Sequence, residues 1–160
     1  MSEIMAARSD IETINDIINP LLGHKAWNVK LGIGSFITIE FGNPIPTARQ
    51  KTRGEWYLWI YCCGWYLENQ NGILAGSEDQ RDRIRQKITI LEDHTIEDIV
   101  VSSPVFETNF VFDGGLVLHT FPLTSIDPYK YWMLFTPQGR VLVLGPAGQW
   151  SYELSSKSRS

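Results

Sequence analysis

The chain has 160 residues, a formal net charge of −4, and cationic side chains that are scattered except for a small group at Arg49, Lys51 and Arg53. This length suits one domain, expected at residues 1–154, which can bury a core without a disulfide or a metal. The acidic balance excludes a protein that binds nucleic acid through its phosphates, because such binding needs a concentrated basic face.

The N-terminal part is predicted to form a helix followed by a β-hairpin. A capping box at residues 9–12, Ser-Asp-Ile-Glu, starts a helix with an apolar stripe that ends near Gly23. Two extended runs follow at residues 26–31 and 35–41, and the Gly-Ile-Gly between them predicts a tight turn. Residues 42–54 contain two prolines and are predicted to be a long loop.

Residues 55–67 form the most apolar segment, with neither proline nor charge after Glu55. Such a run is typical of a central strand whose two faces both need cover, with Trp59 on one face and Trp56 on the other. On this strand Cys62 and Cys63 point to opposite faces, so both are predicted to be reduced core residues of a cytoplasmic protein. No stretch has the length of a membrane span, and the N-terminus lacks the features of a signal peptide.

A second capping box at residues 77–80 predicts a helix from 78 to about 92. The remaining sequence alternates between extended runs and turns, and no internal repeat is evident in it. The predicted strands are residues 96–101, 105–112, 116–121, 129–135, 141–144 and 150–154. This order predicts an α+β fold in which two helices pack on one large, curled, mostly antiparallel sheet, with residues 155–160 as a disordered polar tail.

The sequence carries no spacing typical of catalysis or metal binding. The three histidines lie far apart and the two cysteines diverge, so no catalytic residue, metal site or cofactor is predicted, and a binding protein is favoured over an enzyme. A small-ligand or enzyme pocket would exist if strand pairing gathered four polar residues on one face: Glu40, Glu55, Glu107 and His119. The favoured alternative places these carboxylates at strand ends or on a solvent face, paired with cations or with water.

Aromatic content is the most unusual property of the chain, with six Trp, six Tyr and seven Phe. Exposed clusters of Trp and Tyr anchor protein interfaces. Seven rings are the interface candidates: Trp27, Trp59, Trp65, Tyr131, Trp132, Trp150 and Tyr152. The predicted partner is a protein or a second copy of the chain, and neither nucleic acid nor a membrane; the alternative is an ordinary aromatic core.

Three stretches, LGIGSFITIEFG at 31–42, GEWYLWIYCCGW at 54–65 and YWMLFTP at 131–137, with Leu-Gly-Pro at 144–146, resemble a family of small uncharacterised bacterial proteins, several of them cyanobacterial. The resemblance covers roughly residues 23–153 and implies no activity, cofactor or catalytic residue. The leading hypothesis is a non-enzymatic protein-binding module. By analogy of size and composition, an immunity-type neutraliser of a toxin is one form of it, and an acidic surface suits a basic target. A ligand pocket and a homodimer that buries its aromatic face remain the alternatives.

Overall fold

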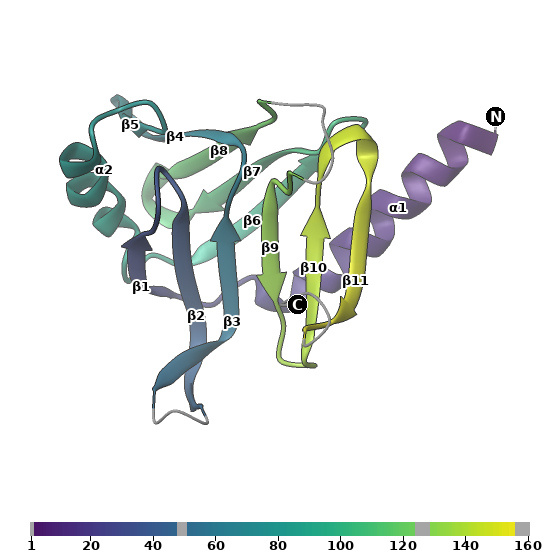
Figure 1. Cartoon of the computed structure of the whole chain (residues 1–160), viewed down its shortest axis with the longest axis horizontal. Helices are drawn as coiled ribbons and strands as arrows, with labels where there is room; N and C mark the ends of the chain where they lie inside the picture. The colour runs from purple at the N-terminus through teal and green to yellow at the C-terminus, as the bar shows by residue number, and fades with distance from the viewer. Residues whose placement is uncertain (1, 48–50, 124–128, 156–160) are drawn as a thin grey trace.

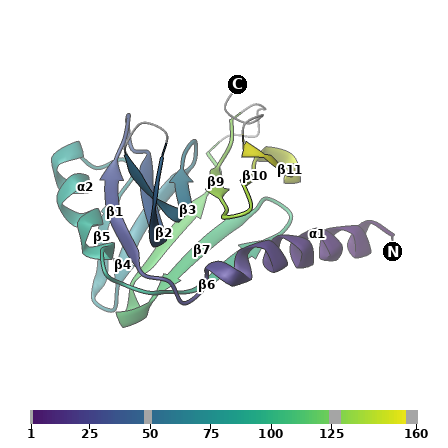
Figure 2. The same cartoon turned by 90° about the horizontal axis from the view of Figure 1, so that it is seen from below.

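The computed structural model describes residues 2–47, 51–123 and 129–155, with side chains from Asp10 onward. The strands of this part of the chain pair antiparallel and form two sheets, a six-stranded sheet in the order β1-β2-β3-β9-β10-β11 and a five-stranded sheet in the order β5-β4-β8-β7-β6. The sheets lie as two layers, and the two α-helices lie at opposite sides of the molecule (Figures 1 and 2). The predicted α+β class with antiparallel pairing is confirmed.

Each sheet is assembled from strands of both halves of the chain. The six-stranded sheet contains β1 (Ala26–Leu31), β2 (Ile37–Pro46), β3 (Thr52–Ile60), β9 (Trp132–Phe135), β10 (Arg140–Leu144) and β11 (Trp150–Leu154). The five-stranded sheet contains β4 (Gly64–Asn69), β5 (Gly72–Gly76), β6 (Ile96–Ser102), β7 (Glu107–Phe112) and β8 (Val117–Phe121). The helical elements are α1 (Ser2–Ile18), α2 (Arg81–Ile88) and the 3-10 turns η1 (Asn19–Leu21), η2 (Thr89–Leu91), η3 (Asp113–Gly115) and η4 (Pro146–Gly148). None of the helices in the described ranges is long and apolar enough to cross a membrane.

The two helices exist, but neither begins at its predicted capping box. Helix α1 already begins at Ser2, and α2 begins only at Arg81. In the second box, the Ser77 hydroxyl accepts a hydrogen bond from the backbone N–H of Trp65 at 3.2 Å, and the Asp79 carboxylate accepts one from Gly76 at 2.8 Å. These side chains therefore close the turn after β5 instead of capping the helix.

The prediction of one central strand over residues 55–67 was wrong. Strand β3 ends at Ile60, the chain turns at residues 61–63, and β4 continues in the other sheet. Residues 55–67 were predicted to be one strand because the segment is apolar throughout. It is apolar because its two strands, β3 and β4, each turn side chains into the core from a different sheet. The 42–54 segment was also misjudged, since β2 and β3 continue through it as a hairpin in which Pro44 lies opposite Gly54. Residues 48–50 of that segment and residues 156–160 of the predicted tail lie outside the described residues.

The two halves of the chain repeat one arrangement, which the sequence analysis missed. The order α1-η1-β1-β2-β3 recurs as α2-η2-β6-β7-β8. Three buried helical residues of the first half recur at the same spacing in the second, namely Ile14, Ile18 and Leu21 as Ile84, Ile88 and Leu91. Where the halves meet, the hydrogen bonds are reciprocal: Gly23 N–H donates to the Ile96 carbonyl and Asp93 N–H donates to the Ala26 carbonyl, each at 2.8 Å. The molecule thus has an approximate internal two-fold symmetry.

The halves also exchange elements. Strand β4 of the first half adds to β8 of the second, and β9 of the second half adds to β3 of the first. Likewise α1 contacts β6, and α2 contacts β1. Trp65 on β4 and Trp132 on β9 occupy equivalent positions and are fully buried. Both halves therefore build a single core between the layers.

Trp132 connects the two layers directly. Its indole N–H donates to the Thr108 hydroxyl of β7 at 3.0 Å, and its ring meets Phe110 edge to face at 5.4 Å between centroids. Trp132→Phe should lower the free energy of unfolding by about 2 kcal/mol, because it removes a buried hydrogen bond and leaves a small cavity. Urea denaturation of Trp132→Phe, Thr108→Val and the double variant tests this. Non-additive losses are expected, and strictly additive losses would contradict the coupling.

Candidate functional site

The outward side of the six-stranded sheet carries an apolar cluster separate from the main core. Strand alternation turns these side chains away from the five-stranded sheet, since their neighbours Leu58, Leu134 and Leu142 point into the core. We call this surface the aromatic face; it consists of Phe36, Tyr57, Trp59, Tyr61, Met133, Phe135, Val141 and Val143. Antiparallel sheets usually present polar residues on the side away from the core, so this composition is unusual.

Rings cross the aromatic face in continuous contact. Trp59 meets Tyr57 edge to face at 5.7 Å, contacts Phe135 at 5.2 Å and stacks on Tyr61 at 6.5 Å between centroids. Tyr61 in turn stacks on Phe36 at 4.3 Å. This row leads from the middle of the sheet to the turn between β1 and β2.

Two apolar hollows lie at the end of this row. The first, of about 180 Å³, is lined by Ile33, Phe36, Trp59 and Tyr61 together with backbone of the β1–β2 turn. The second, of about 310 Å³, is lined by Ser35, Phe36, Tyr61, Cys62, Cys63, Leu123 and Tyr129. Ile33 is 84% exposed, Leu123 62% and Tyr129 51%. Apolar side chains therefore surround both hollows and remain open to solvent.

Trp59 holds a polar group that the described chain does not satisfy. Its indole nitrogen is buried and has no hydrogen-bond partner among the described residues. Leaving a buried N–H without an acceptor costs on the order of 1–3 kcal/mol, so such a group calls for an explanation.

Trp59→Phe should change the free energy of unfolding by less than about 1 kcal/mol, because the loss of ring contacts is offset by removal of the unsatisfied N–H. Urea denaturation monitored by circular dichroism measures this, with Trp65→Phe as the matched control. Trp65 donates to the Ser35 carbonyl at 2.8 Å and is fully buried, so its replacement should cost more. Equal losses in the two variants would contradict the distinction.

The centre of the equivalent surface on the five-stranded sheet is polar, with the rings of Tyr66 and Phe121 beside it. Trp59 on β3 lies opposite Thr38 and Met133, and by the internal symmetry its counterpart is His119 on β8, opposite Asn109 and Tyr66. The His119 ring nitrogens lie 2.7 Å from Asn109 Oδ1 and 2.6 Å from Glu68 Oε1, and Tyr66 stacks on the ring at 4.5 Å. Both ring nitrogens of His119 are therefore engaged by neighbouring side chains.

The structure does not assemble the predicted polar pocket. Glu40 is buried in the six-stranded sheet, where it accepts hydrogen bonds from Asn28 and from Gly54 N–H, and Glu55 accepts one from Asn43 N–H. Glu107 and His119 belong to the other sheet. The four residues therefore belong to separate layers, because the strands of residues 37–60 and of residues 107–121 pair with different neighbours. Glu68, the carboxylate that does reach His119, was missed because only the β4–β8 register brings them together.

Of the seven predicted interface rings, only Trp59 belongs to the aromatic face. Trp65, Tyr131 and Trp132 are core residues. Trp150 and Tyr152 are half-buried and pack against the main core. Trp27 is half-buried and donates to the Gly42 carbonyl at 2.8 Å. Sequence reasoning also missed Phe36, Ile33 and Leu123 at the hollows, and the glycines beside Ile33, typical of a turn, were the one available signal that it is exposed.

The two cysteines are free thiols at the turn between the sheets. Burial raises the pKa of Cys63 to about 12, and burial also raises the pKa of Cys62, so both stay protonated and weakly nucleophilic at neutral pH. Within the described residues, no cluster of His, Cys, Asp and Glu is arranged to hold a metal ion.

At pH 8, iodoacetamide should modify half-buried Cys62 slowly and buried Cys63 only after unfolding, because alkylation needs an exposed thiolate. Mass spectrometry of the native and denatured chain measures both rates. In a Cys62→Ser variant the native chain should stay unlabelled, whereas prompt labelling of that variant would show that Cys63 is reachable.

Protein-family models, curated proteins and solved structures were compared with the chain, and none matches it. The resemblance to small bacterial proteins therefore stays a prediction.

Proposed function

We propose that this chain is a non-enzymatic protein-binding module that uses its aromatic face and the two adjoining hollows. The observation that carries the proposal is the difference between two equivalent surfaces. On one scaffold, the outward side of the five-stranded sheet holds His119, Asn109 and Glu68, whereas the same positions of the six-stranded sheet hold Trp59, Thr38 and Phe135. Solvation alone would favour polar residues on both.

The chemistry of the aromatic face suits a protein partner. Trp and Tyr bury large areas at low conformational cost and dominate the energy of protein interfaces. Met133, Phe135, Val141 and Val143 are buried, so the exposed apolar residues are those at the hollows, Ile33, Leu123 and Tyr129. Exposed apolar residues gathered in this way mark protein interaction sites. An immunity-type neutraliser is one case of this function, in which the bound protein is a toxin. The free thiols of Cys62 and Cys63 support a reducing compartment, the cytoplasm, for the encounter.

The proposal is tested by replacing exposed residues that the fold does not need. Ile33→Asp with Leu123→Asp places two carboxylates at the hollows and should abolish capture of the partner from a lysate of the source organism. Ile73→Asp is the matched control, because Ile73 is 63% exposed but lies on β5 of the other sheet. Quantitative mass spectrometry should find one stoichiometric partner with the wild type and the control, and not with the double variant.

The same preparations, measured by light scattering, separate the remaining outcomes. A wild-type dimer that the double variant converts to a monomer would make the partner a second copy. Capture of the same partner by the double variant, or no captured protein and a monomer, would overturn the proposal.

A further inference from the structure

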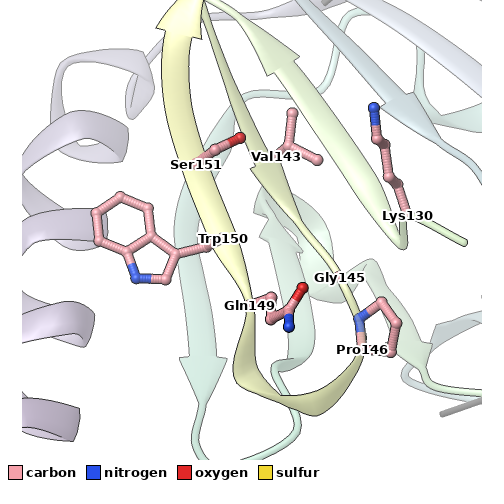
Figure 3. Close-up of a pocket in the computed structure, with 7 residues that line it drawn as sticks. All are labelled: Lys130, Val143, Gly145, Pro146, Gln149, Trp150 and Ser151. Carbon is pink, nitrogen blue, oxygen red and sulfur yellow. The ribbon is translucent and has the colours of Figure 1, made fainter. Parts of the chain in front are cut away.

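Three hollows lie along one end of the six-stranded sheet. The first and second share Phe36 and Tyr61. Tyr129 of the second precedes Lys130, which lines a third hollow of about 150 Å³ at the β10–β11 turn. Figure 3 shows Lys130 on one side of this third hollow, with Val143 beside it and Gln149 and Ser151 across from it. Cavities of about 150 Å³ accept a benzene-sized group, so each hollow can take one apolar side chain.

Cations stand beside these hollows. The β1–β2 register places Lys30 opposite Thr38, which lines the first hollow. The Arg81 guanidinium donates hydrogen bonds to the carbonyls of Gly32 and Gly34 in the β1–β2 turn. Lys130 lines the third hollow and directly follows Tyr129, which lines the second. No ion pair joins any of these three cations to a carboxylate in the part of the chain that the structure describes. The three cations are therefore available to carboxylates of a partner, and the acidic residues nearest to Arg81 in the sequence are Glu78, Asp79 and Asp82.

The outward side of the other sheet has the opposite sign. Its ionisable residues include Glu68, Asp98 and Glu107, and His119 Nε2 lies 2.6 Å from the Glu68 carboxylate. Lys30, Arg81 and Lys130 beside the hollows thus contrast with the carboxylates on the outward side of the other sheet. Complementary charge selects partners and raises the rate of association.

We infer that the partner presents to these hollows an acidic segment, in which one or more apolar side chains are flanked by Asp or Glu. This inference rests on the proposed function and specifies its partner chemistry. The apolar side chains enter the hollows beside Phe36 and Tyr61, and the flanking carboxylates lie next to Lys30, Lys130 and Arg81.

A second copy of the chain fits this surface less well. A symmetric dimer whose two-fold axis passes through the hollows would bring Lys30, Arg81 and Lys130 of each copy toward those of the other, because such a contact uses the same patch twice. Like charges across an interface disfavour association. A separate acidic protein meets no such repulsion.

The test selects peptides from a random display library with the full-length wild-type chain. The enriched peptides should combine an aromatic or aliphatic residue with neighbouring Asp or Glu. The best peptide, labelled with a fluorophore, is then titrated in anisotropy measurements against the wild type and against Lys30→Glu with Lys130→Glu. The double reversal should weaken binding by at least about tenfold, and added salt should weaken wild-type binding.

Lys51→Glu is the matched control. Lys51 is exposed and lies at the β2–β3 hairpin, at the end of the sheet opposite the β1–β2 turn (Figure 1). This control should bind the peptide within about twofold of the wild type, because screening limits the reach of a surface charge to about 10 Å. Circular dichroism confirms that each variant is folded.

Each outcome decides one claim. Enriched peptides that are basic or uncharged, an absence of enrichment, or equal weakening by Lys51→Glu would overturn the acidic preference. Peptide binding that Ile33→Asp with Leu123→Asp abolishes but the charge reversal leaves intact would overturn only that preference and would leave the protein-binding function standing.

Discussion

The rest of the structure depends on the exchange of strands between its two halves. Strand β4 completes the sheet of the second half and β9 completes the sheet of the first, so neither sheet is whole within one half. The chain must therefore cross between layers at residues 61–63, and the layers must stack. Reciprocal hydrogen bonds where Gly23 and Ala26 meet Asp93 and Ile96 hold the halves in register. The buried Trp65 and Trp132 fill the core that results.

This symmetry gives two outward surfaces with the same backbone and different side chains. A pleated strand turns alternate residues to opposite sides, so Trp59 and His119 point away from the main core for the same geometric reason. One surface satisfies its polar groups internally, through the contacts of His119 with Asn109 and Glu68. The other leaves the indole N–H of Trp59 without an acceptor among the described residues and keeps Ile33 and Leu123 exposed. Comparison of the two symmetry-related surfaces therefore identifies the aromatic face as the unusual one.

In the proposed complex, the apolar hollows and the nearby cations would have different roles in recognition. Burial of side chains beside Phe36 and Tyr61 would supply most of the affinity, because interface energy concentrates in a few well-packed aromatic contacts. The cations would chiefly govern which partners approach and how fast, since exposed charges contribute little to affinity once screened by salt. The net negative charge of the chain would discourage acidic proteins elsewhere on the surface, so an acidic partner would be directed to this end of the sheet.

The sequence by itself determined the α+β class, the antiparallel strands and the presence of both helices, because helical and alternating apolar patterns are local. Alternation even separated Tyr57, Trp59 and Tyr61 from Trp56, Leu58 and Ile60. Only the tertiary structure decided that these rings face outward while Trp65 and Trp132 are buried, and that Glu40 and Glu107 belong to different sheets. Strand partners are chosen by contacts distant in the chain, which no local pattern encodes. The spacing of Ile14, Ile18 and Leu21 recurs in the sequence as Ile84, Ile88 and Leu91, but such short apolar spacing is common to all amphipathic helices. Only the reciprocal contacts between the two halves of the folded chain show that the halves are related by symmetry.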